Sequence, residues 1–351
     1  MKVKTHFWAG LVLLASGTAA AAPTVYVPLG DANKIAVIDA ATGQVTATHG
    51  DVINPHGLAV TPDGKRLVIG SNQERRPGQA AIPPKPAGMS EAEHLKHHQA
   101  PPPGAPTPGP GISQVDVLDA ASGRVLRRID VKGAVHHVMV TPDGRYAVST
   151  HATAGGISVI DLGTYKVVRT VATGPVPNYA VVTRDGKRLY VSNAGNGTVS
   201  EIDTANWIVT RNFLAGTAPE HLVLSPDEGR LYLNNVGTGK VSVIDLAAGK
   251  VIKTYTVGKQ PHGIDLSDDG KTLYVAAKGD NTLVAIDLAG GGQRTIRLAP
   301  APYHVTTIRG TGKVYVSSRK KPILWVVDQK DLKVLGEIRT GGVGHQMAVV
   351  R

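Results

Sequence analysis

Histidine recurs at one position of a sevenfold internal repeat, and imidazole is the commonest protein ligand for zinc, copper and haem iron. The chain has 13 histidines among 351 residues, so chance would place fewer than one in seven such positions. The recurrence therefore calls for a physical reason. The shared position holds His56, His136, Asn178, His221, His262, His304 and His345. The segment around His221 contains an insertion, so its alignment is uncertain by one residue and Glu220 is the alternative to His221 at this position.

The repeat that carries these histidines has a period of about 40 residues, which is typical of propellers and solenoids. One unit contains an apolar strand, a PDGK or PDGR turn, a strand ending in YV, a short loop, a VID strand, a turn and a last strand. Each unit therefore predicts four short β-strands separated by Gly, Asp and Pro turns. Seven such units indicate an all-β fold, a seven-bladed β-propeller of four-stranded blades.

The first and last units are incomplete, and each supplies what the other lacks. Residues 24–49 provide only three outer strands, and the final segment HQMAVVR provides a lone inner strand. We therefore expect the C-terminal strand to complete blade one and close the ring, which leaves no sheet without its inner strand. Residues 22–351 then form a single domain.

The N-terminal segment predicts export. Residues 1–21 combine a basic start, a short apolar run and small residues, as in a signal peptide cut after Ala21. The apolar run is too short to span a membrane, and no later run approaches about 20 apolar residues. We therefore expect a periplasmic protein without a membrane span. The chain has no cysteine, which excludes disulfides, covalent c-type haem, blue copper and thiolate-held metals.

The charge pattern says less about partners. The net charge is +11, but the basic residues are scattered through turns, and aromatic residues make up only 4% of the chain. Nucleic-acid binding favours aromatic residues among basic ones, so we do not expect it here. We expect a monomer. The recurrent aspartates of the PDG and VID segments are turn formers rather than catalytic carboxylates.

The repeat resembles the YVTN β-propeller family. The segments that carry the resemblance are RLYVSNAGNGTVSEID, RLYLNNVGTGKVSVID and TLYVAAKGDNTLVAID. The resemblance covers essentially the whole mature chain and extends to periplasmic YncE-type proteins and to the haem d1 domain of cytochrome cd1 nitrite reductases. It implies a propeller fold, and for activity it implies little, since propellers host many functions.

One face of the predicted ring collects the chemistry. The histidine position lies just before the innermost strand, at the end where blades connect, and the loops after the second strands open on the same face. Those loops contribute Asn72, His151, Asn193, Asn235, Lys278 and Arg319. His151 thus lies on this face but outside the recurrent position, and we expect His49 to be an ordinary surface residue.

A Pro- and His-rich insertion at residues 73–111 falls on that face. Its centre predicts a short helix that starts near Ser90 and would behave as a lid, or else the segment is a solvated linker. The lid candidates for metal binding are Met89, His94, His97 and His98.

Three kinds of site are open to converging imidazoles. A multi-copper cluster would use most of the ring, and the adjacent pair His136 and His137 favours it. A non-covalent, haem d1-like tetrapyrrole would take one axial histidine. An organic ligand would take hydrogen bonds alone. The candidate metal ligands are His56, His136, His137, His221, His262, His304 and His345. The candidate cations for tetrapyrrole carboxylates are Arg75, Arg76, Lys278, Arg319 and Lys320.

We therefore expect a metal- or tetrapyrrole-binding propeller with a redox or cofactor-handling role, served by a periplasmic electron-transfer or cofactor-delivery protein. Two alternatives remain. One is a cofactor-free scaffold for a protein or small ligand, in which histidine is merely tolerated by a wet channel. The other is a metal-dependent lyase of the streptogramin-lyase type, which would need a base beside a divalent ion.

Overall fold

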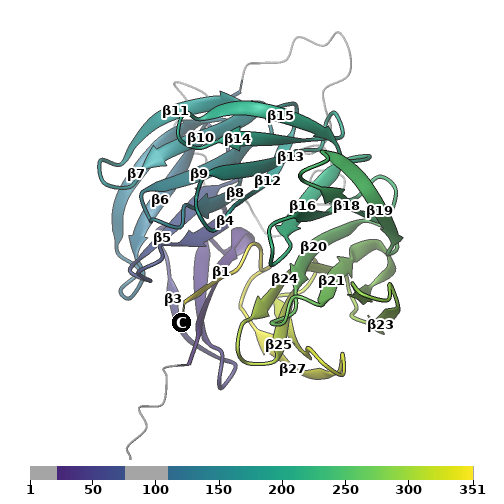
Figure 1. Cartoon of the computed structure of the whole chain (residues 1–351). Coiled ribbons are helices and arrows are strands. Elements are labelled where there is room, and N and C mark those ends of the chain that lie inside the picture. The colour runs from purple at the N-terminus through teal and green to yellow at the C-terminus, as the bar shows by residue number, and fades with distance from the viewer. Residues whose placement is uncertain (1–21, 76–109, 351) are drawn as a thin grey trace, which may run out of the picture.

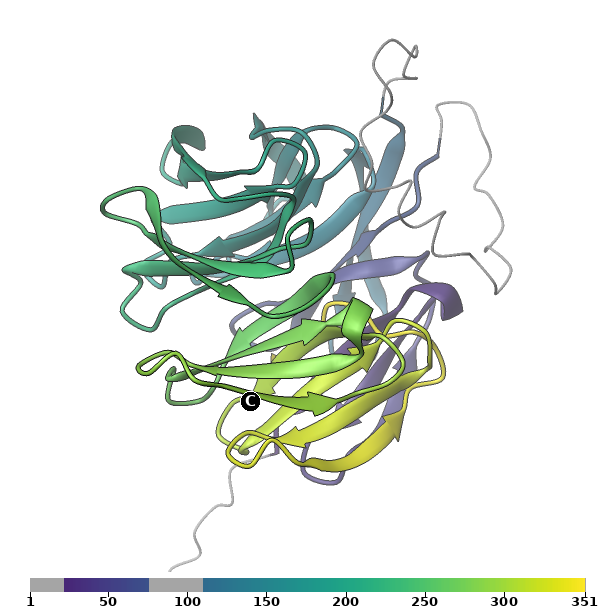
Figure 2. The same cartoon turned by 90° about the vertical axis from the view of Figure 1, so that its right-hand side faces the viewer.

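The computed structural model describes residues 22–75 and 110–350, and these form seven four-stranded antiparallel sheets arranged in a ring (Figures 1 and 2). The predicted all-β, seven-bladed propeller is confirmed. The proposed signal peptide at residues 1–21 and the lid candidates Met89, His94, His97 and His98 lie outside the described residues, as does Arg76. No helix in the described ranges is long and apolar enough to cross a membrane.

The blades follow the chain in order, each running from the channel outward. Blade one contains β28 (Ala348–Val350), β1 (Thr24–Leu29), β2 (Lys34–Asp39) and β3 (Gln44–His49). Blade two contains β4 (Pro55–Val60), β5 (Arg66–Ser71), β6 (Ile112–Asp119) and β7 (Val125–Lys132). Blade three contains β8 (Val135–Val140), β9 (Tyr146–His151), β10 (Gly156–Asp161) and β11 (Lys166–Ala172). Blade four contains β12 (Pro177–Val182), β13 (Arg188–Asn193), β14 (Thr198–Asp203) and β15 (Ile208–Leu214).

The remaining blades repeat this plan. Blade five contains β16 (Pro219–Leu224), β17 (Arg230–Asn235), β18 (Lys240–Asp245) and β19 (Lys250–Thr256). Blade six contains β20 (Pro261–Leu266), β21 (Thr272–Ala277), β22 (Thr282–Asp287) and β23 (Gln293–Arg297). Blade seven contains β24 (Pro302–Ile308), β25 (Lys313–Ser318), β26 (Ile323–Asp328) and β27 (Val334–Arg339). Two short 3-10 turns, η1 (Gly30–Ala32) and η2 (Lys278–Asp280), follow β1 and β21.

The ring is closed by the C-terminal strand, as the incomplete end units predict. β28 pairs with β1 antiparallel, with Tyr26 opposite Ala348 and Thr24 opposite Val350. Figure 1 shows the C-terminus beside β1. Blade one therefore joins segments from both ends of the described chain.

The hydrophobic core lies between blades rather than in the channel. Seven clusters of buried residues each join the facing sheets of two neighbouring blades. Buried tyrosines add polar links, since Tyr26 Oη donates to the Ala120 carbonyl (3.1 Å) and Tyr274 Oη to the Gln329 carbonyl (2.6 Å). The alternating apolar residues of the strands thus pack blade on blade and leave polar residues for the axis.

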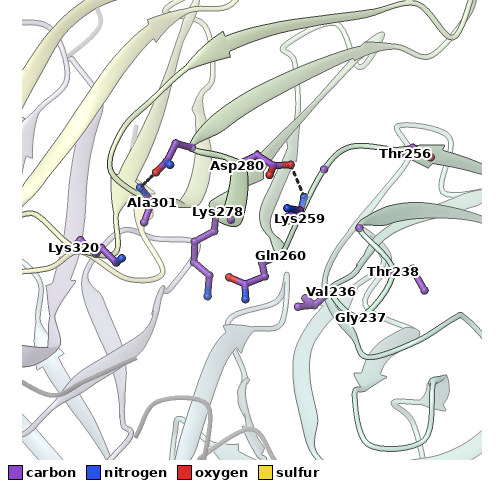
Figure 3. A pocket seen from close by; sticks show the side chains of 14 residues that line it. Val236, Gly237, Thr238, Thr256, Lys259, Gln260, Lys278, Asp280, Ala301 and Lys320 are labelled. Carbon is purple, nitrogen blue, oxygen red and sulfur yellow. Dashed lines mark hydrogen bonds between the residues drawn. The ribbon is translucent and has the colours of Figure 1, made fainter. Parts of the chain in front are cut away.

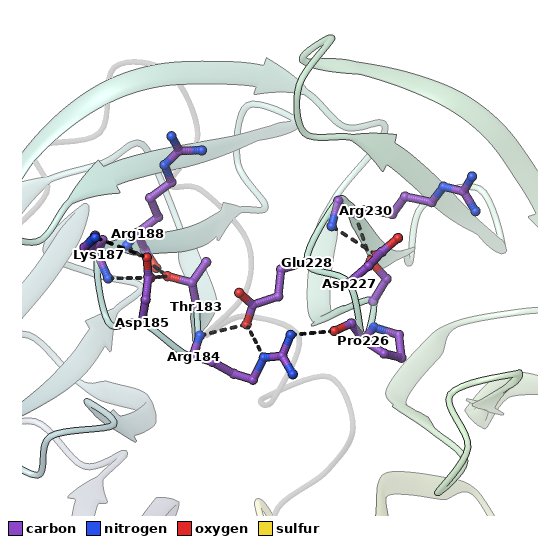
Figure 4. A network of polar contacts seen from close by, with 11 residues as sticks. Thr183, Arg184, Asp185, Lys187, Arg188, Pro226, Asp227, Glu228 and Arg230 are labelled. Carbon is purple, nitrogen blue, oxygen red and sulfur yellow. Dashed lines mark hydrogen bonds and ion pairs between the residues drawn. The ribbon is translucent and has the colours of Figure 1, made fainter.

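The aspartates of the PDG segments are turn formers, as expected. Thr61 Oγ1 donates to Asp63 (2.5 Å), whose carboxylate also accepts from the backbone N–H of Lys65 (3.1 Å), and the same arrangement recurs in later blades. On this face Arg184 links blades four and five by hydrogen bonds to Glu228 and to the Pro226 carbonyl (Figure 4). These carboxylates lie at the opposite ends of the strands from the histidines.

A β-bulge distinguishes the start of the inner strands. In β12, for example, Pro177 lies opposite Asn193 and Ala180 opposite Val191, so two residues of β12 face the single residue Ser192. The same register shift occurs in β4, β8, β16, β20 and β24. A bulge re-aims side chains that a regular strand would send to alternate faces. Two consecutive residues per blade can therefore serve the channel.

Two glycines in the bulges bring neighbouring inner strands into backbone contact. A Cβ atom on Gly57 would lie 2.7 Å from the Cα atom of His137, and one on Gly263 would lie 2.4 Å from the Tyr303 carbonyl oxygen. Only glycine leaves room for such an approach. Blades two and three, and blades six and seven, are thereby drawn close together at the level of the histidines.

We expect Gly57→Ala to lower the free energy of unfolding by about 2 kcal/mol or more, because the new methyl group would collide with backbone atoms that cannot rotate away. Chemical denaturation would measure the change. Gly50→Ala is the matched control, since a Cβ there meets nothing within 4 Å. Equal stability of the two variants would contradict the close approach.

Candidate functional site

The structure divides the recurrent histidine position into two adjacent ones. Counting from the first residue of β4, β8, β12, β16, β20 and β24, the second position holds His56, His136, Asn178, Glu220, His262 and Tyr303, and the third holds Gly57, His137, Tyr179, His221, Gly263 and His304. In blade one the corresponding residues are His345 and Gln346, which precede β28 and follow Gly344, the bridge partner of Leu29. The single shared position expected from the sequence is therefore wrong for His221 and His304. The bulge explains the error, because it lets side chains from both positions reach the axis.

Small polar residues of the second strands hold the bulged backbone in place. The N–H groups of His137, Tyr179 and His304 donate to Thr150 Oγ1 (3.0 Å), Ser192 Oγ (3.1 Å) and Ser317 Oγ (3.1 Å). In blade five, Asn234 Nδ2 donates to the carbonyl of His262 (2.6 Å). These side chains replace ladder bonds that the bulge removes, which fixes the direction of each imidazole.

The seven candidate histidines form a continuous ring. Going round it, the distances between ring centroids are 4.2 Å from His345 to His56, 4.7 Å to His136, 4.3 Å to His137, 4.6 Å to His221, 4.3 Å to His262, 5.1 Å to His304 and 6.0 Å back to His345. All seven side chains are buried, with 1–5% of their surface exposed. Imidazoles from six blades therefore meet around one axis.

Two groups of three imidazoles are compact enough to hold a metal ion. The ligand nitrogens of His56, His136 and His137 lie within 4.8 Å of one another, and so do those of His137, His221 and His304. Nitrogen ligands of a zinc ion lie about 2.0–2.1 Å from it, so modest rotations of the rings would close either group on one ion. His137 belongs to both groups.

Hydrogen bonds to backbone carbonyls set the tautomer of two of these rings. Nδ1–H of His56 donates to the His136 carbonyl (2.7 Å), and Nδ1–H of His137 donates to the Asn178 carbonyl (2.9 Å). A carbonyl only accepts, so each ring carries its proton on Nδ1 and a lone pair on Nε2. Metal-bound histidines commonly donate their other ring N–H to a carbonyl or carboxylate in the same way. Among the described residues, His137 Nε2 is buried without a hydrogen-bond partner.

At His262 the carboxylate of Glu220 takes the place of the backbone carbonyl. Its Oε2 atom lies 2.7 Å from His262 Nδ1, and His262 Nε2 has no hydrogen-bond partner in the described part of the chain. Tyr303 stacks on the His262 ring with 3.9 Å between centroids and 6° between planes. Glu220 thus occupies the recurrent position for which it was the alternative to His221, and Tyr303 was not predicted. The Pro-X-X segment at the start of five inner strands could have revealed both, had its two variable residues been considered together.

Burial controls protonation at this site. It lowers the pKa of His137 and His262 well below the usual value, and neighbouring imidazoles lower it further. Burial raises the pKa of Glu220 to about 7, partly offset by the Lys278 cation. The imidazoles of His137 and His262 are therefore neutral at pH 7, the form that binds metals.

Gln346 crosses the channel next to the imidazoles. Its Oε1 accepts from the backbone N–H groups of Leu58 (3.1 Å) and Val138 (3.2 Å), and its Nε2 donates to the Val138 carbonyl (3.0 Å). It thus ties the C-terminal segment to blades two and three. Sequence analysis missed this residue, and a lone glutamine offers no signal that would have found it.

Not every predicted residue belongs to the ring. Lys278 Nζ and the Arg319 guanidinium lie 5.8 and 5.5 Å from the Tyr303 ring centroid, above which they place positive charge. Arg75 instead pairs with Asp130 on the outside of blade two. His151 is buried and contacts the Gly133 carbonyl (3.2 Å) and Ser149 Oγ (3.0 Å).

The expectation that His49 is a surface residue is wrong. Its side chain is buried between blades one and two, where the ring lies near Tyr26 and Nε2 donates to the Ala120 carbonyl (3.0 Å). The blade contact, invisible in the sequence, covers the last residue of this outer strand.

The described ends of the insertion are fixed to the loop-bearing face. Arg75 and Ile112 form a two-way backbone bridge (2.8 Å each), and Glu74 accepts hydrogen bonds from the backbone of Ala134 (2.7 Å) and Gly111 (3.2 Å). The two described ends of the insertion therefore lie side by side at the start of β6.

A tetrapyrrole does not fit between the imidazoles. His56, His136 and His137 lie 4.3–5.4 Å apart between centroids, and the opposite His304 is only 6.2 Å from His56. These are contacts between packed rings, which leave no slot for a flat macrocycle among them, whereas a macrocycle across the channel mouth with one axial histidine would lie outside this cluster. The donor set among the rings could hold a metal ion.

The fold and the buried histidine ring define a β-propeller with an axial polar site. The sequence matches, over residues 112–335, the family model described as outer membrane protein assembly factor BamB. That range is more than half of the chain, and the chain belongs to this family. The match is to this family rather than to the YVTN family in particular. None of the curated proteins compared with the chain matches it in sequence.

Solved structures agree on the fold. Hydrazine synthase from Kuenenia stuttgartiensis is 17% identical, with 92% of this chain and 100% of that chain covered and a TM-score of 0.68. The periplasmic gluconolactonase PpgL from Pseudomonas aeruginosa is 18% identical, with 94% and 99% covered and a TM-score of 0.68. Dihydro-heme d1 dehydrogenase NirN in complex with DHE is 14% identical, with 96% and 68% covered and a TM-score of 0.64. At these identities the likeness concerns the fold alone.

We expect His151 to make the protein less stable in acid. Burial lowers its pKa from 6.5 to about 4, so only the unfolded chain takes up this proton between those values. Its contribution to the free energy of unfolding is complete above pH 6.5 and falls by about 3 kcal/mol as the pH drops to 4. Denaturation of wild type and His151→Gln between pH 4 and 7 would measure it. Parallel curves for the two proteins would contradict the shift.

Proposed function

We propose that the histidine ring binds a transition-metal ion, copper in the periplasm, and that the protein has a redox or metal-handling role there. The observation that carries the proposal is His137, which is common to both three-histidine groups and keeps a lone pair on a buried Nε2 without a hydrogen-bond partner among the described residues. A buried polar atom without a partner costs about 1–3 kcal/mol, which a bound ion would recover.

Copper is favoured by the donor set. Imidazole suits zinc, copper, iron and nickel, and copper(II) binds most tightly of the divalent first-row ions to a given site. When bound, copper would supply one-electron chemistry. The chain itself would hold the ion with His56, His136 and His137 or with His137, His221 and His304, and the carbonyls of His136 and Asn178 would keep the Nδ1 protons away from it.

The periplasmic location rests on the N-terminal sequence and on the kind of family matched. The same sequence argument makes an electron-transfer or metal-delivery protein of that compartment the expected partner. The resemblance to YVTN propellers supports a periplasmic protein in the same way.

We expect metal-free protein to bind copper(II) stoichiometrically and His137→Gln to lose at least about 100-fold in affinity, because both ligand groups lose a member. Isothermal titration with copper and metal analysis after dialysis would measure this. His49→Gln is the matched control, because His49 is equally buried but lies outside the ring. Circular dichroism would confirm that both variants fold.

Other outcomes would favour the alternatives. A protein that takes up no metal would contradict the proposal and favour a cofactor-free scaffold. Preference for a redox-inactive divalent ion over copper would overturn the redox role and favour the lyase, for which Glu220 beside His262 is the candidate base.

A further inference from the structure

A second polar site adjoins the histidine ring on the loop-bearing face. It is a hollow of about 1010 Å³, formed by the loops of blades five, six and seven (Figure 3). A volume of this size lies at the upper end of the range for small-molecule sites. The residues that line it include Thr238, Thr256, Lys259, Gln260, Lys278, Asp280, Asn281 and Lys320.

The hollow carries positive charge on separate loops. Lys259 comes from the connection between blades five and six, Lys278 from the loop after β21, and Lys320 from the loop after β25. Among the described residues that line the hollow, Asp280 is the acidic one, and its carboxylate accepts the backbone N–H of Lys259 (2.7 Å). Figure 3 shows the side chains of Lys278 and Gln260 extending into the same space.

The lining of the hollow argues against two kinds of ligand, a flat aromatic ring and a single phosphate held by backbone N–H groups. None of the described residues that line the hollow is aromatic, so among them a flat ring system would find nothing to stack on. The backbone N–H groups of two of its glycines are occupied, since Gly239 donates to the Asn235 carbonyl in its own turn (3.0 Å) and Gly279 to the Lys259 carbonyl of the neighbouring loop (2.9 Å). A nest of backbone donors that would hold a single phosphate is therefore not formed by these loops.

Lys278 of the hollow and Tyr303 behind it connect the hollow to the histidine ring. Tyr303 stacks on His262 on one side, and Lys278 Nζ lies 5.8 Å from the centroid of the same tyrosine ring. Lys278 also acts electrostatically on Glu220 and His262. A ligand held by Lys278 would therefore lie one side chain away from the imidazoles.

We propose that this hollow binds a small polar polycarboxylate, whose separated carboxylates pair with Lys259, Lys278 and Lys320. Hydroxyl or amide groups of such a ligand would meet Thr238, Thr256 and Gln260. That the ligand serves the metal centre rests on the proposed function, whereas binding itself does not.

The test uses metal-free full-length protein and isothermal titration with citrate, succinate and inorganic phosphate at low ionic strength. We expect citrate to bind at least tenfold more tightly than succinate or phosphate, because it alone offers three separated carboxylates. Lys278→Gln and the double variant Lys259→Gln/Lys320→Gln should each weaken citrate binding about tenfold. Lys187→Gln is the control, since Lys187 is a well-exposed lysine on the opposite face.

Three results would overturn the inference: no citrate binding, phosphate binding as tight as citrate binding, or equal losses in Lys187→Gln and Lys278→Gln. The two proposals fail separately. His137→Gln should still bind citrate, and a protein that binds copper but not citrate would refute the hollow and leave the metal site standing.

Discussion

The bulge at the start of each inner strand is the constraint on which the site depends. A regular strand would send His136 and His137 to opposite faces, and only one would reach the axis. With two residues opposite one of the neighbouring strand, both rings reach it. The backbone groups released by the bulge are paired by Thr150, Ser192 and Ser317, so the polar residues of the second strand are as much a part of the site as the imidazoles.

The glycines and the histidines both depend on close packing of the inner strands. Gly57 and Gly263 let neighbouring inner strands approach each other, and at the same level imidazole rings from different blades come into contact. Burial and the neighbouring imidazoles lower the pKa of His137 and His262, which leaves these two rings neutral. The same burial that makes them poor bases leaves them in the form suited to a metal ion.

The sequence predicts the fold well because the same pattern of strands and turn residues recurs along the sevenfold repeat. It also predicts that the histidines converge, since each begins an inner strand. It fails on register, because aligning the histidines with one another puts His221 and His304 level with His56, whereas the proline that begins five inner strands shows that they lie one residue later. It fails on His49 and Gln346 because contacts between blades distant in the chain decide their surroundings.

Ring closure and site assembly are one event in this molecule. β28 pairs with β1 over three residues, and the segment just before it carries both His345 and Gln346. Fraying of this short strand would withdraw an imidazole from the ring and the glutamine that joins blades two and three. The strength of this three-residue pairing therefore sets how often the complete ring of imidazoles is present, so a change that loosens the seam would weaken the site without touching any other blade.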